Sequence, residues 1–428
     1  MAGNTNIIQL TEHQEIVGEV RSIVQNLPIE FIETPYQQAP KFLGVTPDYK
    51  ASYYIGADWL SENLTIVVTP KMKNIHYMKM FLCALDFDLP SDYFSLFYGI
   101  DFDKREVVCE GLKDEVTPLL IIHFLSTLKR LLKRGLKKDY VVREENLSSK
   151  IKGHILISKN IQKNVIPQRL DRNYCRFQEY TVDHPENRLL KKAVLFVERY
   201  LSQSPELNSV NQLRNRLNIY LAHFETISDQ IEISQIRSIA NNKLYREHTE
   251  AVKLAKQILR RFSYSIHEVS SCVAKVPVFW IDMSRLYEVY VYSLLHQAYG
   301  DLIEFQVPGY RGTAVDFIKK DQYMIIDTKY KPHYGNGNKG IVDDVRQISG
   351  YARDKKILKR LLGDRYDEDF VPRCLIIYPE KDNRLVNSED EEEDKEIIVF
   401  DGKDILKEAV PIKAFRNFYK LSVLLPTI

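Results

Sequence analysis

Two aspartates and a lysine with the chemistry of a hydrolytic site lie close together in the segment AVDFIKKDQYMIIDTKYKP, residues 314–332. Residues 323–326 form a short apolar run typical of a β-strand, which Asp327 and Lys329 extend. Side chains alternate faces along a strand, so these two point the same way. The polar stretch before the run predicts a tight connection to the preceding strand. In such a hairpin Asp316 lies within one or two residues of facing Asp327.

Two carboxylates and an amine at the end of a buried sheet suit metal-assisted phosphodiester hydrolysis. Neighbouring carboxylates repel unless a cation neutralises them, and a hard ion such as Mg²⁺, or Mn²⁺ as an alternative, favours oxygen ligands. We expect Asp316, Asp327 and the carbonyl of Thr328 to ligate the metal. Lys329 would orient water or stabilise charge on the phosphate. The competing interpretation is an internal salt bridge between Asp and Lys.

The D-x-K pattern is weak evidence by itself, because it recurs at residues 48–50, 354–356 and 401–403. We interpret those three copies as surface charge. Only the copy at Asp327 lies on an apolar strand with a second aspartate on a neighbouring strand, so the prediction of catalysis rests on that context.

Three further residues are candidates for the same site. Glu288 lies in a helix, residues 284–299, with apolar side chains on all its faces, so it is a candidate third acid and metal ligand. Pairing with a nearby basic side chain is the alternative. Gln347 and Tyr351 share a helix face after the strand pair and would orient Lys329, water or phosphate. A polar cover over the core is the alternative for these two.

The glycines at positions 335, 337 and 340 spell G-x-G-x-x-G, but we reject a dinucleotide site there. The segment HYGNGNKG is polar and opens no hydrophobic βαβ unit. No G-x-x-x-x-G-K-[ST] motif occurs, so we expect no nucleotide to bind to this chain.

A basic, amphipathic helix is predicted around residues 128–138, where leucines recur at helical spacing. Either its charges form a solvated face over a core, or they contact the phosphates of double-stranded DNA. The candidate DNA-binding residues are Lys129, Arg130, Lys133, Arg134, Lys137 and Lys138.

The pattern of elements predicts a multi-domain α/β protein in three regions. Residues 1–110 read as a small α+β module, and 111–270 as a mainly helical region. Residues 271–428 read as an α/β domain with a mixed central sheet, in which one helix spans 342–361. The acidic run at 388–396 is expected to be a solvated loop.

Bulk composition narrows the class of protein. The net charge of +2 excludes a global electrostatic field for nucleic acid, so local patches must supply such contacts. Five dispersed cysteines argue against a disulfide framework or a cysteine-based zinc site. We find neither a signal peptide nor a membrane-spanning run, and expect a cytoplasmic protein without membrane contact.

Several motifs in order resemble the McrC family, the nuclease subunits of McrBC-type 5-methylcytosine-specific restriction systems. The resemblance extends from about residue 115 to 380 and includes the D…D-x-K core and the Gln347–Tyr351 pair. The other matching segments are Lys152–Ile155 with Ser158–Lys159, Asn187–Lys191, Asp282–Met283, Leu286–Glu288 and Leu375–Pro379. The core is similar to the PD-(D/E)xK nuclease superfamily, except that Val315 stands where proline usually precedes the first aspartate.

The resemblance implies a DNA endonuclease domain over 271–428 with the metal-binding acids and lysine at positions 316, 327 and 329. It also implies a partner, an McrB-like AAA+ GTPase ring that reads modified double-stranded DNA and whose GTP hydrolysis this chain stimulates. Residues 1–110 are candidates for docking on that ring. Two alternatives are a non-catalytic activator of the ring and a stand-alone RecB-like repair nuclease.

Overall fold

The computed structural model describes residues 6–26, 43–72, 75–76, 79–81, 96–101, 104–109, 116–203, 211–236, 245–265, 274–331, 339–380, 405–407 and 409–426. The chain forms two compact units, one made of residues 1–116 and 272–428 and the other of residues 117–271. The bounds of the second unit, 117–271, are close to those of the helical region expected at 111–270. The first and third predicted regions instead share one unit, because a strand of the third pairs with strands of the first.

The N-terminal part of the first unit is a five-stranded mixed sheet of order β1-β3-β2-β10-β4. Its strands are β1 (Asn6–Thr11), β2 (Tyr54–Ser61), β3 (Leu64–Thr69), β4 (Tyr98–Asp101) and β10 (Val278–Asp282). β1 is parallel to β3, and β10 is antiparallel to both β2 and β4. Residues 278–282 were assigned to the C-terminal region without a predicted strand, whereas β10 belongs to the N-terminal sheet. A short pair, β5 (Val107–Cys109) and β9 (Ala274–Val276), joins the same two stretches of chain.

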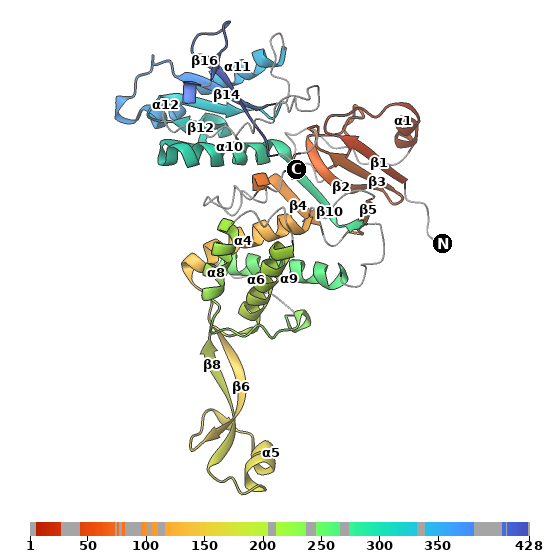
Figure 1. Cartoon of the computed structure of the whole chain (residues 1–428), viewed down its shortest axis with the longest axis vertical. Coiled ribbons are helices and arrows are strands. Elements are labelled where there is room, and N and C mark those ends of the chain that lie inside the picture. Colours follow the sequence, from red (N-terminus) through yellow and green to blue (C-terminus); the bar gives the residue numbers. More distant parts are fainter. Residues whose placement is uncertain are drawn as a thin grey trace, which may run out of the picture. The chain divides into compact units, whose positions relative to one another are not determined.

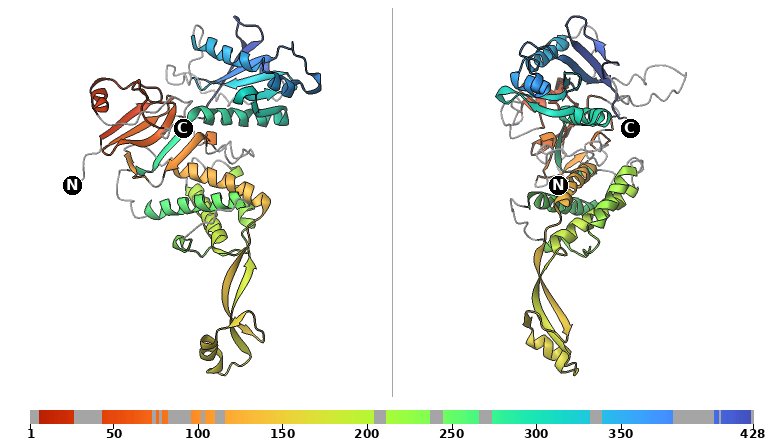
Figure 2. Two further views of the ribbon diagram at one scale, coloured as in Figure 1. Left: turned by 180° about the vertical axis from the view of Figure 1, so that it is seen from behind. Right: turned by 90° about the vertical axis from the view of Figure 1, so that its left-hand side faces the viewer.

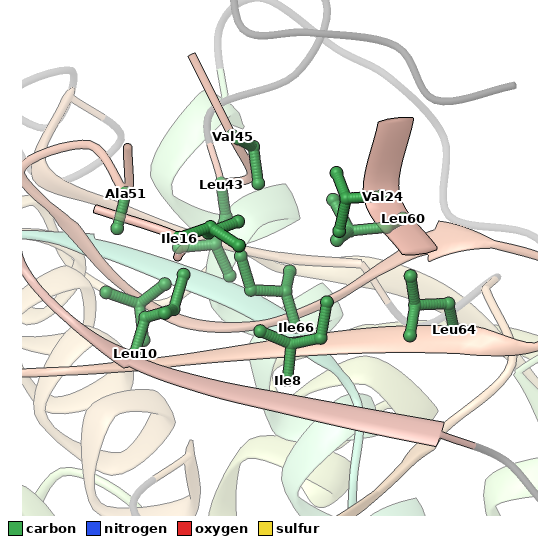
Figure 3. Packing of buried hydrophobic residues seen from close by; sticks show 11 residues of the cluster. Ile8, Leu10, Ile16, Val24, Leu43, Val45, Ala51, Leu60, Leu64 and Ile66 are labelled. Atoms are coloured by element: carbon green, nitrogen blue, oxygen red, sulfur yellow. The ribbon is translucent and has the colours of Figure 1, made fainter. Parts of the chain in front are cut away.

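The core of this sheet is aliphatic. Figure 3 shows Val24 of α1 (Gly18–Gln25), together with Leu43 and Val45, above side chains of the strands, among them Ile8 and Ile66. Ile66 and Val24 are fully buried, so α1 closes one face of the sheet. Burial of each such side chain contributes about 1.5–3 kcal/mol.

The second sheet of this unit has six strands in the order β11-β12-β13-β14-β16-β15. They are β11 (Ile303–Pro308), β12 (Ala314–Lys319), β13 (Met324–Thr328), β14 (Arg373–Pro379), β15 (Val410–Pro411) and β16 (Phe418–Val423). β12 and β13 are antiparallel, whereas β13, β14 and β16 run parallel. The mixed sheet and the α/β class agree with the sequence prediction. The strand expected from the apolar run at 323–326 corresponds to β13, and the strand expected before it corresponds to β12.

Helices cover both faces of this second sheet. Figure 1 shows α10 (Met283–Tyr299) along one side and α11 (Lys339–Tyr351) and α12 (Lys355–Leu362) along the other. The single helix predicted over 342–361 is wrong. The Asp354 carboxylate accepts hydrogen bonds from the backbone N–H groups of Lys356 and Ile357 and so starts a new helix. Short 3-10 turns complete the layer: Gly300–Leu302, Tyr310–Gly312, Gly363–Arg365 and Ile405–Lys407.

The second unit combines helices with a long β-ribbon. The helices are α4 (Val116–Arg134), α6 (Pro185–Gln203), α8 (Asn211–Ala222), α9 (Arg246–Ser265) and the 3-10 turn Ile233–Gln235. The ribbon consists of β6 (Asp139–Ser148) and β8 (Arg172–Thr181), with β7 (His154–Ile155), α5 (Ile157–Asn160) and the π-turn Ile161–Val165 at its end. Figure 2 shows the twisted ribbon carrying α5 at its tip.

The ribbon was missed by the prediction of a mainly helical region. Both strands carry exposed or half-buried side chains on both faces, including charged ones such as Arg143 and Glu144. They therefore lack the alternation of apolar and polar residues that marks a half-buried strand. The ribbon is held by backbone pairing over ten residue pairs, from Asp139 with Thr181 to Ser148 with Arg172.

Two cysteines, Cys175 and Cys374, are free and buried in the described part of the chain. This agrees with the expectation of reduced thiols, although the other three cysteines lie where side chains are not described. Among the described helices, none is both long and apolar enough to cross a bilayer.

Candidate active site

The pairing of β12 with β13 brings the two aspartates together. Phe317 pairs with Ile326 and Ile318 with Ile325, so continuing this register by one residue sets Asp316 opposite Asp327. Residues directly opposite in an antiparallel pair share a face of the sheet. Apolar residues on both strands bury the hairpin, and the two carboxylates lie near its open end.

Asp316 is fixed by the strand opposite. Its Oδ2 accepts hydrogen bonds from the backbone N–H of Thr328, at 2.7 Å, and from the Thr328 hydroxyl, at 2.6 Å. Burial raises the pKa of the Asp316 carboxyl, while these hydrogen bonds and the charge of Lys329 lower it, and the net direction is upward. Thr328 thus holds one oxygen of Asp316 through its side chain and its backbone N–H.

Asp327 is also buried and has a strongly raised pKa. It is 2% exposed, and its Oδ2 lies 2.5 Å from Nζ of Lys329. Burial, followed by repulsion from Asp316, raises the pKa of Asp327 to about 7 in spite of the lysine. The Asp–Lys salt bridge expected as the competing interpretation is therefore present. One ammonium does not balance two ionised carboxylates at this depth, and the raised pKa of both aspartates reflects this, because a proton takes the place of a second cation.

Lys329 is held from the helix side of the site. Burial lowers its pKa, but Asp327, Asp316 and Asp344 raise it more, so the amine is charged. Nζ of Lys329 donates to Oε1 of Gln347 at 3.0 Å, and Nε2 of Gln347 donates to the hydroxyl of Tyr351 at 3.0 Å. The structure thus brings Gln347 and Tyr351 together with the lysine, in the chain of contacts expected of orienting residues.

Glu288 was the candidate third acid of the site. It is on α10, whose Tyr292 stacks on Phe317, a neighbour of Asp316 that points to the opposite face of the sheet. Its Oε1 accepts a hydrogen bond from Nε2 of Gln306 on β11. Within the described ranges, no three Asp, Glu, His or Cys side chains gather as one metal-binding group. The structure therefore does not bring Glu288 into a three-acid cluster with the two aspartates.

Gln306 is a residue that sequence reasoning missed. It falls between Phe305, which pairs with Phe317, and Val307, which pairs with Val315, so it lies across from Asp316. Its φ of 50° is a conformation that residues other than glycine, asparagine and aspartate seldom adopt. Nothing in the sequence around Gln306 signals this conformation or the bond to Glu288.

The oxygen donors of the cluster fit a hard divalent cation. Asp316 and Asp327 supply two carboxylates whose ionised forms a cation would stabilise, and the Thr328 carbonyl is a further candidate ligand. Mg²⁺ characteristically binds one or two carboxylates and keeps water and phosphate as its other ligands. A pair of acids is therefore sufficient, and a third protein carboxylate is not required.

The predicted DNA-binding residues lie in the second unit and are partly engaged within it. α4 ends at Arg134, before Gly135 with its φ of 89°, so Lys137 and Lys138 lie beyond the helix that was expected to contain them. Arg130 donates to Ser126 and Thr127. Arg134 pairs with Glu247 at 2.7 Å, and Lys137 with Asp139 and Glu186. Lys133 and Lys138 are exposed, and Lys129 is half-buried.

Three stretches discussed from the sequence lie wholly or partly outside the described residues: the glycine-rich segment at 333–340, the acidic run at 388–396 and the D-x-K copy at 401–403. The other two copies of D-x-K are described and differ from the one at Asp327. Asp48 and Lys50 are exposed beside a turn, and Asp354 caps α12.

Comparisons with known proteins give one family match and two distant structural matches. Residues 49–360 match a family model described as McrBC 5-methylcytosine restriction system component. No curated protein matches the chain. A chain of a refined half-complex of Thermococcus gammatolerans McrB AAA+ hexamers with bound McrC is similar at 16% identity and a TM-score of 0.38, over 99% of this chain and 95% of that one. A chain of the T. gammatolerans McrBC complex is similar at 17% identity and a TM-score of 0.31, over 68% and 88%.

Proposed function

Because the chain belongs to the family of McrBC 5-methylcytosine restriction system components, we propose that it is the DNA-cleaving subunit of such a system. Its second sheet would be a PD-(D/E)xK nuclease core that hydrolyses phosphodiester bonds with Mg²⁺. The observation that carries this proposal is the buried pair Asp316 and Asp327 at the end of a β-hairpin, with raised pKa values and one lysine beside it.

The residues of the cluster divide the chemistry among them. Asp316 and Asp327 would hold Mg²⁺, with the Thr328 carbonyl as a further ligand. When bound, the ion would supply Lewis-acid polarisation of the scissile phosphate and of a nucleophilic water. Lys329 is protonated, so it cannot act as a base; it would orient the water and stabilise negative charge on the phosphoryl group. Gln347 fixes the direction of the lysine amine.

The partner in this proposal is an AAA+ GTPase ring of the McrB type. The sequence contains no P-loop motif, so nucleotide binding and hydrolysis would belong to the partner, which would also read the modified double-stranded DNA. We place the system in the cytoplasm. Recognition of DNA and cleavage of DNA would then lie on different chains.

Cleavage by the assembled system tests the proposal. The full chain is mixed with an McrB-type AAA+ GTPase, GTP, Mg²⁺ and methylated double-stranded DNA, and the products are resolved on a gel. Asp327→Asn should abolish cleavage and retain GTPase stimulation. The matched control is Asp354→Asn, the same substitution in another D-x-K, which should cleave normally.

The same assay separates the alternatives. A non-catalytic activator would leave the DNA intact with the wild-type chain while GTP hydrolysis is stimulated. A stand-alone repair nuclease would degrade DNA ends without partner or GTP. Cleavage by Asp327→Asn at the wild-type rate would refute the assignment of the site.

A further inference from the structure

We propose that Lys71, which is held in place by Glu12, is a positioning residue for Lys329. Through Lys71 the N-terminal sheet sets the geometry of the nuclease site. The inference rests on the proposed function for its catalytic readout. It concerns residues far from 327–329 in the sequence, which neither the D-x-K pattern nor the family match singles out.

Lys71 contacts the chain directly after the catalytic lysine. Its Nζ donates to the backbone carbonyl of Tyr330 at 2.7 Å and lies 4.1 Å from the centroid of the Tyr330 ring. The two residues are 259 positions apart in the chain. Beyond Thr328 the strand ends, so this carbonyl has no place in the regular ladder of β13. Lys71 supplies the hydrogen bond that the sheet does not.

Glu12 holds Lys71 in place. Glu12 and Lys71 follow the ends of β1 and β3, whose last residues Thr11 and Thr69 pair in register. The backbone N–H of Lys71 donates to Oε2 of Glu12 at 2.9 Å, and the N–H of Glu12 donates to the Thr69 carbonyl at 3.0 Å. Glu12 is 4% exposed. Burial raises its pKa to about 7, although Lys71 lowers it.

The Glu12 carboxylate and the Lys71 amine attract each other, but desolvation of the two groups offsets most of that attraction, so it adds little to the stability of the fold. Such pairs are better suited to fixing one geometry than to increasing stability. Here the geometry is that of residue 330, the immediate neighbour of Lys329. Tyr330 is itself buried, with its ring 5.8 Å from that of Tyr287 on α10.

An ion pair with α11 also restrains the same segment. Nζ of Lys331 contacts both carboxylate oxygens of Asp344 on α11, at 2.8 and 2.9 Å. Asp344 precedes Gln347 by three residues, so both project from one face of the helix. The two residues after Lys329 are therefore both held: the backbone of Tyr330 by Lys71 of the N-terminal sheet, and the side chain of Lys331 by α11. A misplacement of about 1 Å in such a site can cost roughly 100-fold in rate.

The kinetic test compares Lys71→Met with the wild-type chain in the assembled system. Loss of the anchor should lower kcat for cleavage by about 10-fold, the lower range for removal of a supporting contact, with KM for DNA and GTPase stimulation unchanged. Lys71→Arg, which keeps a donor, should recover most of the rate. Lys104→Met is the matched control. Lys104 also pairs with a buried carboxylate, that of Asp58 at 3.4 Å, but Asp58 lies on β2 and not beside Lys329.

Hydrogen exchange of the full chain provides a readout that does not depend on catalysis. Lys71→Met should speed exchange of the amides at 329–331 and leave β2 and β3 protected. If the wild-type chain does not cleave DNA, the proposed function fails while this readout still tests the anchor. Wild-type kcat in Lys71→Met, or exchange that rises equally throughout the unit, would overturn the inference.

Discussion

Two copies of the D-x-K pattern in the first unit, at 327–329 and 354–356, have opposite consequences. At 327–329 the aspartate ends a buried strand, faces a second aspartate and has a pKa raised to about 7. At 354–356 the aspartate begins a helix and accepts hydrogen bonds from the N–H groups of Lys356, Ile357 and Tyr310. The first carboxylate is destabilised by its surroundings, whereas the second has its charge satisfied by backbone donors.

This contrast shows what distinguishes a candidate site from a structural motif. Backbone donors at a helix N-terminus favour the ionised form of an aspartate and leave it nothing further to bind. Burial beside a like charge leaves a carboxylate pair that a cation would stabilise. The local environment, and not the D-x-K sequence, makes 327–329 the candidate for catalysis.

The largest effect is expected for removal of the acid that faces Asp327. Asp316→Ala should reduce cleavage by more than about 100-fold, since loss of even a supporting residue around a metal costs roughly 10–100-fold. Asp354→Ala should leave the cleavage rate of the folded protein unchanged. Initial rates at saturating Mg²⁺ measure both. Equal losses in the two variants would remove the distinction between the copies.

The binding of Mg²⁺ at Asp327 should also depend on pH. The pKa of Asp327 is raised from 3.8 to about 7 on folding, so its protonation stabilises the folded protein. This contribution is complete below pH 3.8 and is lost as pH rises through 7. Mg²⁺ requires the ionised form, so its affinity should rise about tenfold per pH unit below 7 and level off above it. Thermal shifts induced by Mg²⁺ at pH 6 and 8 measure this, with Asp327→Asn as the control that shows no such shift.

A smaller effect is expected from the residue that holds the lysine. Gln347→Leu removes the acceptor 3.0 Å from Nζ of Lys329 and should lower kcat by about 10-fold. The affinity for Mg²⁺ should not change, because Gln347 contacts no carboxylate ligand in the described contacts. Single-turnover cleavage and a Mg²⁺ titration test the two parts separately. A weaker affinity for the ion would contradict the role given to Gln347.

For the helix cap the expected effect is on stability alone. Asp354→Ala should lower the free energy of unfolding by about 1 kcal/mol, the usual cost of losing an N-cap side chain. Urea denaturation monitored by circular dichroism measures the change. A stability equal to that of the wild type would show that the three backbone bonds contribute nothing.

The exposed copy of the pattern should show the smallest effect. Asp48 lies on the surface beside a turn, so Asp48→Asn should change the free energy of unfolding by less than about 0.5 kcal/mol. Cleavage should be that of the wild type. A marked loss of cleavage would assign this copy a role that its exposure does not suggest.

The sequence predicted those features of the fold that depend on neighbouring residues. The apolar run before Asp327 identified β13, and the short connection predicted that Asp316 would face it. The site residues Asp316, Asp327 and Lys329 follow from these two local patterns. Their roles in catalysis remain proposals.

Other features depend on contacts that local patterns do not contain. β10 pairs with β2 and β4, which lie far before it in the sequence, so its residues were assigned to the wrong region. Lys71 reaches Tyr330 in the same way, from the N-terminal sheet. The ribbon of β6 and β8 was missed because it buries little on either face, so its sequence lacks the alternation that predicts strands.

Binding of a divalent ion tests the central claim most directly. Titration of the full chain with Mn²⁺, followed by electron paramagnetic resonance of the free ion, should show saturable binding that Mg²⁺ displaces. The double variant Asp316→Asn/Asp327→Asn should lose this binding, and Asp354→Asn should retain it. Undiminished binding in the double variant would contradict a metal site at the end of the β12–β13 hairpin.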